Sequence, residues 1–127
     1  MRRVFKTRYF SRWMRKTELG DAALCAAVGE MVTGLIDADL GGGVFKKRVA
    51  LPGRGKSGSA RTLVATNKGS RWFFIFGFEK SERANISTKE VEAVQAIASD
   101  LLRLGSSQLD AHVASEALME ICHDSEG

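Results

Sequence analysis

Three short runs rich in β-branched and aromatic residues follow one another in the middle of the chain, and each predicts a β-strand. Residues typical of turns separate the runs, which are Val44–Leu51, Arg61–Asn67 and Arg71–Phe78. The turn Asn67-Lys68-Gly69-Ser70 is short enough for an antiparallel hairpin between the second and third strands. We therefore expect an antiparallel sheet at the centre of the fold.

The side chains of the first predicted strand divide between two faces. Successive residues of a strand point to opposite sides, so Phe45, Val49 and Leu51 share one face and Lys46 and Arg48 share the other. The predicted sheet thus has an apolar face and a basic face.

Apolar residues at helical spacing precede the central strands. Val4–Thr7 predicts a short strand, and the next apolar residues form a helical stripe that we assign to the core: Tyr9, Phe10, Trp13 and Met14. A second helix is expected to begin near Asp21, a good N-cap, and to run to about Asp37. The glycines at 41–43 should then turn the chain into the sheet.

Two more helices are predicted after the strands. Ser87 and Glu90 have the Ser-x-x-Glu spacing of a capping box, and apolar residues follow on one helical face up to Leu101. Residues 105–107 break this helix. Beyond the break, the spacing of apolar residues predicts a weaker fourth helix over Leu109–Ile121, with an acidic exposed side.

The length of 127 residues fits one domain whose core needs neither disulfides nor a metal. Cys25 and Cys122 lie far apart in separate helical patterns, so we expect two buried or half-buried thiols in a reducing cytosol rather than a disulfide. The basic start of the chain lacks the apolar run of a signal peptide, and no segment is long enough to span a membrane. We therefore expect a cytoplasmic protein with no membrane association.

The net charge of +4 hides a strong segregation of charge along the chain. Residues 1–20 carry +6, residues 21–43 carry −4, residues 44–83 carry +8 and residues 84–127 carry −6. Like charges held this close repel one another unless an anion binds them. A solvated basic face is the ordinary explanation of such a run, but its concentration on one sheet and its loops favours nucleic-acid binding.

Common catalytic and metal-binding motifs are absent from the sequence. Residues 53–58, GRGKSG, approach a phosphate-binding loop, but that motif requires glycine where the chain has Ala50, and a strand rather than a helix follows. No G-x-S-x-G, H-E-x-x-H or paired-cysteine zinc pattern is present. His112 and His123 have no partner at ligand spacing, so we expect surface histidines and neither a metal nor a cofactor.

The central stretch resembles the RelE/HigB-like toxins of bacterial type II toxin–antitoxin systems. The resemblance is carried by Leu35–Ala65 and Phe73–Ser87, which contain the elements K-x-R-V, G-x-G-K-x-G, S-x-R and G-F-x-K-x-E-R. It implies an α+β fold, a small antiparallel sheet with helices packed on one face. It covers residues 1–104, where we expect the toxin domain, and leaves residues 105–127 as an acidic C-terminal helical extension.

The resemblance also assigns roles to side chains. The active face of the family falls on four cations, expected to be catalytic: Lys46, Arg48, Arg61 and Lys80. Other side chains on the same strands and loops are expected to bind nucleic acid: Lys47, Arg54, Lys56, Lys68, Arg71, Phe78 and Arg83. Such toxins often have an aromatic or histidine side chain near the end of the last strand. This chain offers only Phe76 and Phe78 there, which can stack on a base but cannot transfer a proton.

Members of the family cut messenger RNA in the ribosomal A site without a metal, by attack of a ribose 2′-hydroxyl on the adjacent phosphate. Arg48 and Arg61 suit the charge that develops on the phosphoryl oxygens, because a guanidinium group binds phosphate through two parallel hydrogen bonds. Lys46 or Lys80 are candidates for a share in proton transfer. The sequence identifies no general base.

Two other functions stay open at this point. Some relatives poison DNA gyrase, and a catalytically idle relative would use the same face only to bind nucleic acid. The resemblance further implies a helix-turn-helix antitoxin as the partner. The oligomeric state does not follow from the sequence.

Overall fold

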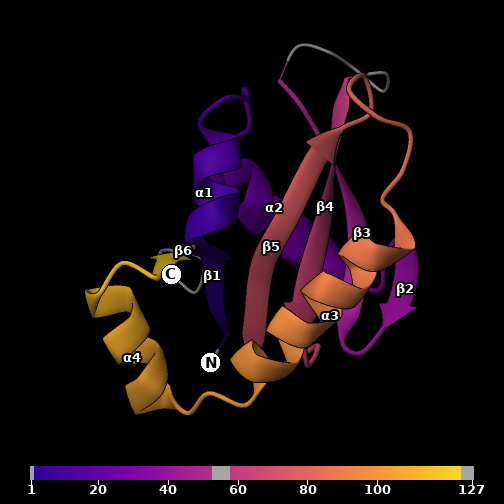
Figure 1. Cartoon of the computed structure of the whole chain (residues 1–127). Coiled ribbons are helices and arrows are strands. Elements are labelled where there is room, and N and C mark those ends of the chain that lie inside the picture. Colours follow the sequence, from indigo (N-terminus) through magenta and orange to yellow (C-terminus); the bar gives the residue numbers. More distant parts are fainter. Residues whose placement is uncertain (1, 53–57, 124–127) are drawn as a thin grey trace.

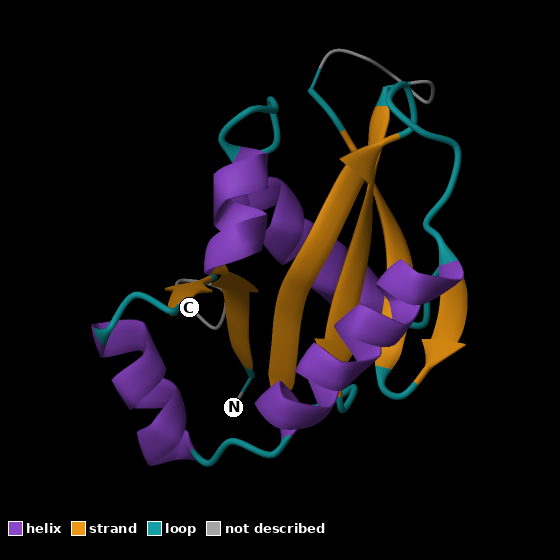
Figure 2. Ribbon diagram, viewed as in Figure 1, coloured by secondary structure: helices purple, strands orange, loops and turns teal. Residues whose placement is uncertain are grey.

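The computed structural model describes residues 2–52 and 58–123 (Figure 1). In this part of the chain, six strands form one sheet and four helices pack against it (Figure 2). In chain order the elements are β1 (Arg3–Thr7), α1 (Arg8–Met14), α2 (Asp21–Val32), β2 (Ala38–Gly41), β3 (Val44–Ala50), β4 (Ser59–Thr66), β5 (Arg71–Glu79), α3 (Thr88–Leu102), α4 (Ser106–Ala114) and β6 (Leu118–Ile121).

The strands lie in the order β2-β3-β4-β5-β1-β6. β1 runs parallel to β5, and every other neighbouring pair is antiparallel. The predicted hairpin joins β4 and β5, and the predicted capping box of Ser87 and Glu90 opens α3. The predicted α+β class with a largely antiparallel sheet is confirmed.

Helices cover both faces of the sheet, which corrects the expectation that they pack on one. Helices α1 and α2 pack on the face that carries Val64 and Phe74, here called the back face. Helices α3 and α4 pack on the face that carries Leu63 and Phe73, here called the front face. The cause lies in β5, whose residues from Trp72 to Ile75 are all buried and therefore offer apolar side chains to both faces.

Helix α2 ends earlier than its apolar pattern predicts. Gly34 has a φ of +99°, its N–H bonds to the carbonyl of Met31, and the N–H of Leu35 bonds to the carbonyl of Glu30. This pair of hydrogen bonds is the Schellman motif that ends many helices. The chain released after Leu35 forms β2, a strand that the sequence pattern did not predict, and Asp37 is placed immediately before it.

The predicted fourth helix is correct only in its first part. After α4 the chain turns at Glu116, which has a φ of +66°, and forms β6 against β1. Leu118 and Ile121 of this strand are buried, and Arg3 of β1 bonds to Glu120 at 2.9 Å. The end of the expected helical extension is therefore a strand of the sheet, held by apolar contacts and by an ion pair.

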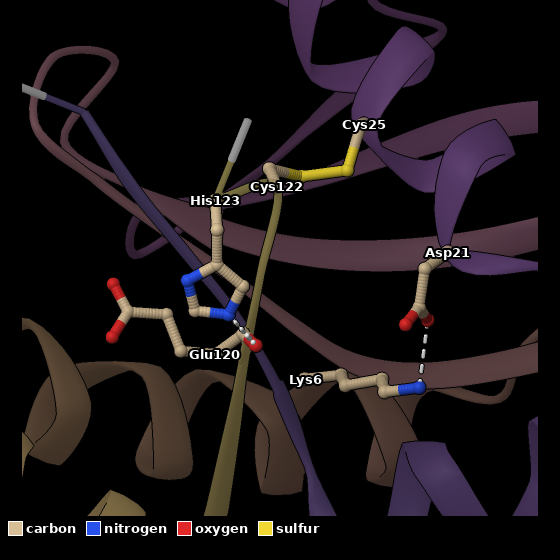
Figure 3. The surroundings of a disulfide bond; sticks show 6 residues. All are labelled: Lys6, Asp21, Cys25, Glu120, Cys122 and His123. Carbon is tan, nitrogen blue, oxygen red and sulfur yellow. Dashed lines mark hydrogen bonds and ion pairs between the residues drawn. A yellow bond between two sulfur atoms is a disulfide. The ribbon is translucent and has the colours of Figure 1, made fainter. Parts of the chain in front are cut away.

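The two cysteines form a disulfide, which corrects the expectation of free thiols. Cys25 in α2 and Cys122 just after β6 are bonded, with their Cα atoms 5.6 Å apart (Figure 3). β1 brings them together, because it pairs with β6 and its Lys6 bonds to Asp21 at the start of α2, at 2.7 Å. A separation of 97 residues hid this proximity in the sequence.

Replacing both cysteines with serine is expected to lower the free energy of unfolding of the oxidised protein by about 2–4 kcal/mol, since the bond closes a long loop of the unfolded chain. Urea denaturation with and without a reducing agent measures the effect. The reductant should destabilise the natural chain to the level of the double variant and leave the variant unchanged. Equal stability of the oxidised natural chain and the variant would show that the bond contributes nothing.

Candidate nucleic-acid interface

Two rows of side chains cross the front face of β3, β4 and β5. The pairing of β3, β4 and β5 places Arg48 opposite Arg61 and Arg61 opposite Phe78. In the parallel row, Lys46 lies opposite Leu63 and Leu63 opposite Phe76. Neighbouring strands are about 4.8 Å apart, so the cations of β3 and β4 form a compact group.

The cations of these rows surround a polar cleft of about 240 Å³. Among the described residues, its lining is formed by Asp37, Lys46, Arg48 and Arg61. Arg61 is half-buried, and its guanidinium donates to the hydroxyl of Ser59, which limits the positions that the side chain can take. Three cations around one hollow attract an anion such as phosphate, because each would otherwise be repelled by the other two.

Asp37 is the carboxylate of the cleft. Its Oδ2 accepts a hydrogen bond of 2.6 Å from the backbone N–H of Arg48, and its Oδ1 lies 3.6 Å from the Arg48 guanidinium. Its own backbone N–H bonds to the carbonyl of Lys46 at 3.0 Å. The side chain is 29% exposed. Hydrogen bonds between β3 and both the side chain and the backbone of Asp37 therefore fix the position of this carboxylate, while part of it stays accessible to a ligand.

Comparison with known protein families identifies the family of this chain. Residues 2–121 match the family described as the RelE toxin of the RelE/RelB toxin–antitoxin system. The chain belongs to the RelE toxin family. A search of curated proteins finds no match. The family match extends through α4 and β6, so it includes most of the segment that the sequence resemblance left out.

The remaining predicted catalytic cation of this RelE-family toxin is Lys80. It is exposed in the turn after β5, close in sequence to Phe78 and at the end of the sheet where Arg61 lies. Within the described part of the chain, it is not among the residues that line the cleft. Lys80 therefore lies outside the toxin's cleft, beyond the end of β5 that carries Phe78.

Phe78 and Arg83 lie together at the same end of the front face. Phe78 is only 3% exposed, and the Arg83 guanidinium lies 5.3 Å from its ring centre. Arg83 also donates two hydrogen bonds to the carboxylate of Glu90, which lower the pKa of that carboxyl to about 2. In the free toxin, both side chains are thus occupied by contacts within the protein.

Three other predicted nucleic-acid contacts are not brought to the cleft. Lys47 points to the back face, where it is 6% exposed and its Nζ lies 2.8 Å from Glu30 Oε1. Side chains alternate between the two faces along β3, so the front-face positions of Lys46 and Arg48 already imply that Lys47 lies on the back face. Lys68 and Arg71 lie at the hairpin end of β5, opposite the end that carries Phe78. Arg54 and Lys56 fall outside the described residues.

No helix in residues 2–52 and 58–123 is long and apolar enough to cross a membrane.

Sequence reasoning missed Asp37 because it assigned this residue to the end of a helix. The signal that could have located it is the run of three glycines at 41–43, which permits a tight turn and hence a hairpin with the Asp37 segment as the partner of β3.

Proposed function

We propose that this RelE-family protein is a metal-independent endoribonuclease that cuts messenger RNA on the ribosome and thereby inhibits translation. The observation that carries the proposal is the cleft in which Lys46, Arg48 and Arg61 converge with the carboxylate of Asp37. This set contains an acid–base pair and two phosphate-binding guanidinium groups. Those are the groups that cleavage of an RNA phosphodiester without a metal requires.

The proposed reaction begins when Asp37 accepts the proton of the ribose 2′-hydroxyl. The 2′-oxygen forms a bond to the adjacent phosphorus while the bond to the 5′-oxygen breaks. Arg48 and Arg61 stabilise the negative charge on the phosphoryl oxygens, and Lys46 donates a proton to the departing 5′-oxygen. The products are a 2′,3′-cyclic phosphate and a 5′-hydroxyl end. Lys80, in the turn after β5, holds a neighbouring phosphate.

The electrostatics of the cleft favour the binding of an anion. Arg48 and Arg61 lie directly opposite each other on neighbouring strands, an arrangement of like charges that destabilises a sheet. Asp37 offsets the charge of Arg48 only in part, because the ion pair spans 3.6 Å. A bound phosphate relieves the remaining repulsion, so binding of RNA is expected to stabilise the fold.

The family pairs its toxin with an antitoxin. We infer that the antitoxin of this chain is a helix-turn-helix protein, that it is encoded beside the toxin, and that both act in the cytoplasm, where the ribosomes are. In that compartment we expect Cys25 and Cys122 to be reduced to thiols, since cytosolic thiols are normally held in that state.

Induction of the protein alone in growing bacteria tests the proposal against a gyrase-directed toxin. Incorporation of labelled methionine should fall within minutes, ahead of incorporation of labelled thymidine, and co-expression of the neighbouring reading frame should restore growth. An early loss of thymidine incorporation with protein synthesis intact would support attack on gyrase. Normal growth after induction, with the protein folded and present, would contradict a toxin of either kind.

A further inference from the structure

A second hollow lies on the front face beside the cationic cleft. Its volume is about 420 Å³, within the range of roughly 300–1,000 Å³ typical of ligand pockets. The start of α1, the middle of β5 and one side of α3 form its walls. The lining is mostly apolar and includes Tyr9, Ile75, Phe76, Ala93, Val94 and Ile97.

Aromatic rings form one wall of this hollow and stay accessible. Tyr9 is 57% exposed, and its ring lies nearly parallel to that of Phe76, with centroids 5.8 Å apart and an angle of 6° between the planes. β5 continues past the end of β1, and Tyr9, two residues after that end, lies beside the length of β5 that pairs with β4 but not with β1. Exposed apolar surface of this kind commonly marks a binding site.

The aromatic wall lies close to the cationic cleft in the register of the sheet. The ring centroid of Phe76 is 6.3 Å from that of Phe78, and Phe78 lies directly opposite Arg61. Phe76 is separated from Lys46 only by Leu63, that is by two strand spacings or about 10 Å. Proteins that bind single-stranded nucleic acid combine these features, a cationic track for phosphates and aromatic rings on which the bases stack.

We propose that Tyr9 and Phe76 form a nucleobase-binding subsite, which stacks one base of the RNA while Lys46, Arg48 and Arg61 hold a neighbouring phosphate. The ligand class rests on the proposed function, because that function supplies the RNA. An apolar segment of a partner protein is the other class of occupant that such a lining suits. The short distance between Phe76 and the cations favours RNA, since an apolar peptide gains nothing from the phosphate-binding cleft.

Binding of a short single-stranded oligoribonucleotide that contains the fluorescent base 2-aminopurine tests the subsite, with the full chain at low salt. Stacking on Tyr9 should quench the fluorescence of the bound oligonucleotide. Tyr9→Ala should lose the quenching and weaken binding about 5- to 150-fold, the usual effect of removing one stacked ring. Tyr9→Phe should keep both properties. Tyr9→Leu, which is apolar but not aromatic, should behave like Tyr9→Ala.

Leu35→Ala is the matched control, because Leu35 is 59% exposed in the loop after α2 and away from the hollow. It should bind and quench like the natural chain. Unchanged binding and quenching in Tyr9→Ala and Tyr9→Leu would overturn the subsite, and the proposed nuclease would stand if Arg61→Ala still lost cleavage. Normal RNA binding by Tyr9→Ala together with loss of its antitoxin would assign the hollow to a protein and also overturn the subsite. Failure of the natural chain to bind the oligonucleotide would overturn the subsite, whereas the proposed nuclease would stand if the same protein still cut ribosome-bound messenger.

Discussion

Replacing Arg61 with alanine is expected to slow messenger RNA cleavage by about 10²–10³-fold, the usual cost of removing one preorganised donor to a developing oxyanion. Binding of RNA should weaken only modestly, with a salt slope lower by roughly one unit, because a single phosphate contact is lost. Thermal stability should stay the same or rise, since the substitution removes one of two opposed cations. Cleavage and binding of ribosome-bound messenger, with thermal denaturation, measure the three quantities.

Arg71→Ala is the control for this experiment. Arg71 lies on the same strand that pairs with Arg61 but at its far end, where its guanidinium donates to Ser106 Oγ at 3.2 Å. Its loss should reduce nonspecific RNA affinity without a selective effect on cleavage. If the two variants lose cleavage equally, or if a folded Arg61→Ala protein still arrests growth, Arg61 is not catalytic. A large loss of stability in Arg61→Ala would instead indicate a structural role through Ser59.

Asp37→Asn is expected to reduce cleavage by about 10²–10⁴-fold, the usual contribution of a general base. The same substitution should leave RNA affinity unchanged or raise it, because it removes the carboxylate that repels phosphate from the cleft. Asparagine keeps an oxygen that can accept the Arg48 backbone N–H, so the fold should persist. A fall in cleavage without a fall in RNA affinity would indicate that Asp37 transfers a proton. If Asp37 only affected phosphate binding, cleavage and affinity would change in the same direction.

Asp39→Asn is the matched control for Asp37. Asp39 lies on β2 two residues further on, is exposed, and its Oδ1 accepts the backbone N–H of Gly41 at 2.9 Å. It does not line the cleft as far as the structure describes the chain. Cleavage by Asp39→Asn should match the natural chain. If Asp37→Asn cleaves at the natural rate, the carboxylate only neutralises Arg48 and the general base lies elsewhere.

The strands that hold the cations could be predicted from the sequence because their β-branched and aromatic runs are bounded by clear turn residues. The alternation in β3 also separated Lys46 and Arg48 from the apolar face, and the same rule implied the buried position of Lys47. The grouping of Lys46 and Arg48 with Arg61 depends on the register between the strands. Only the pairing of β3 with β4 brings Arg48 opposite Arg61, and no local pattern encodes that pairing.

The sequence analysis missed residues whose positions depend on contacts between distant segments of the chain. Tyr9 shares a helical stripe with core residues, and its exposure follows from the different lengths of β1 and β5. Asp37 joins the cleft because a Schellman motif ends α2 early. β6 has only four residues, too few for a convincing period of two, and its packing against β1 also brings Cys122 to Cys25.

The position of the cut and the chemistry of its ends test the central claim most directly. Purified protein is added to ribosomes stalled on an end-labelled messenger, either natural or with a single 2′-deoxynucleotide at the cleaved position. The natural messenger should be cut within the A-site codon, leaving a 2′,3′-cyclic phosphate, and the deoxy-substituted messenger should remain intact at that position. Cleavage of both messengers at the same rate would exclude attack by the 2′-hydroxyl. Cleavage of neither by the folded protein would contradict the assignment as a ribosome-dependent nuclease.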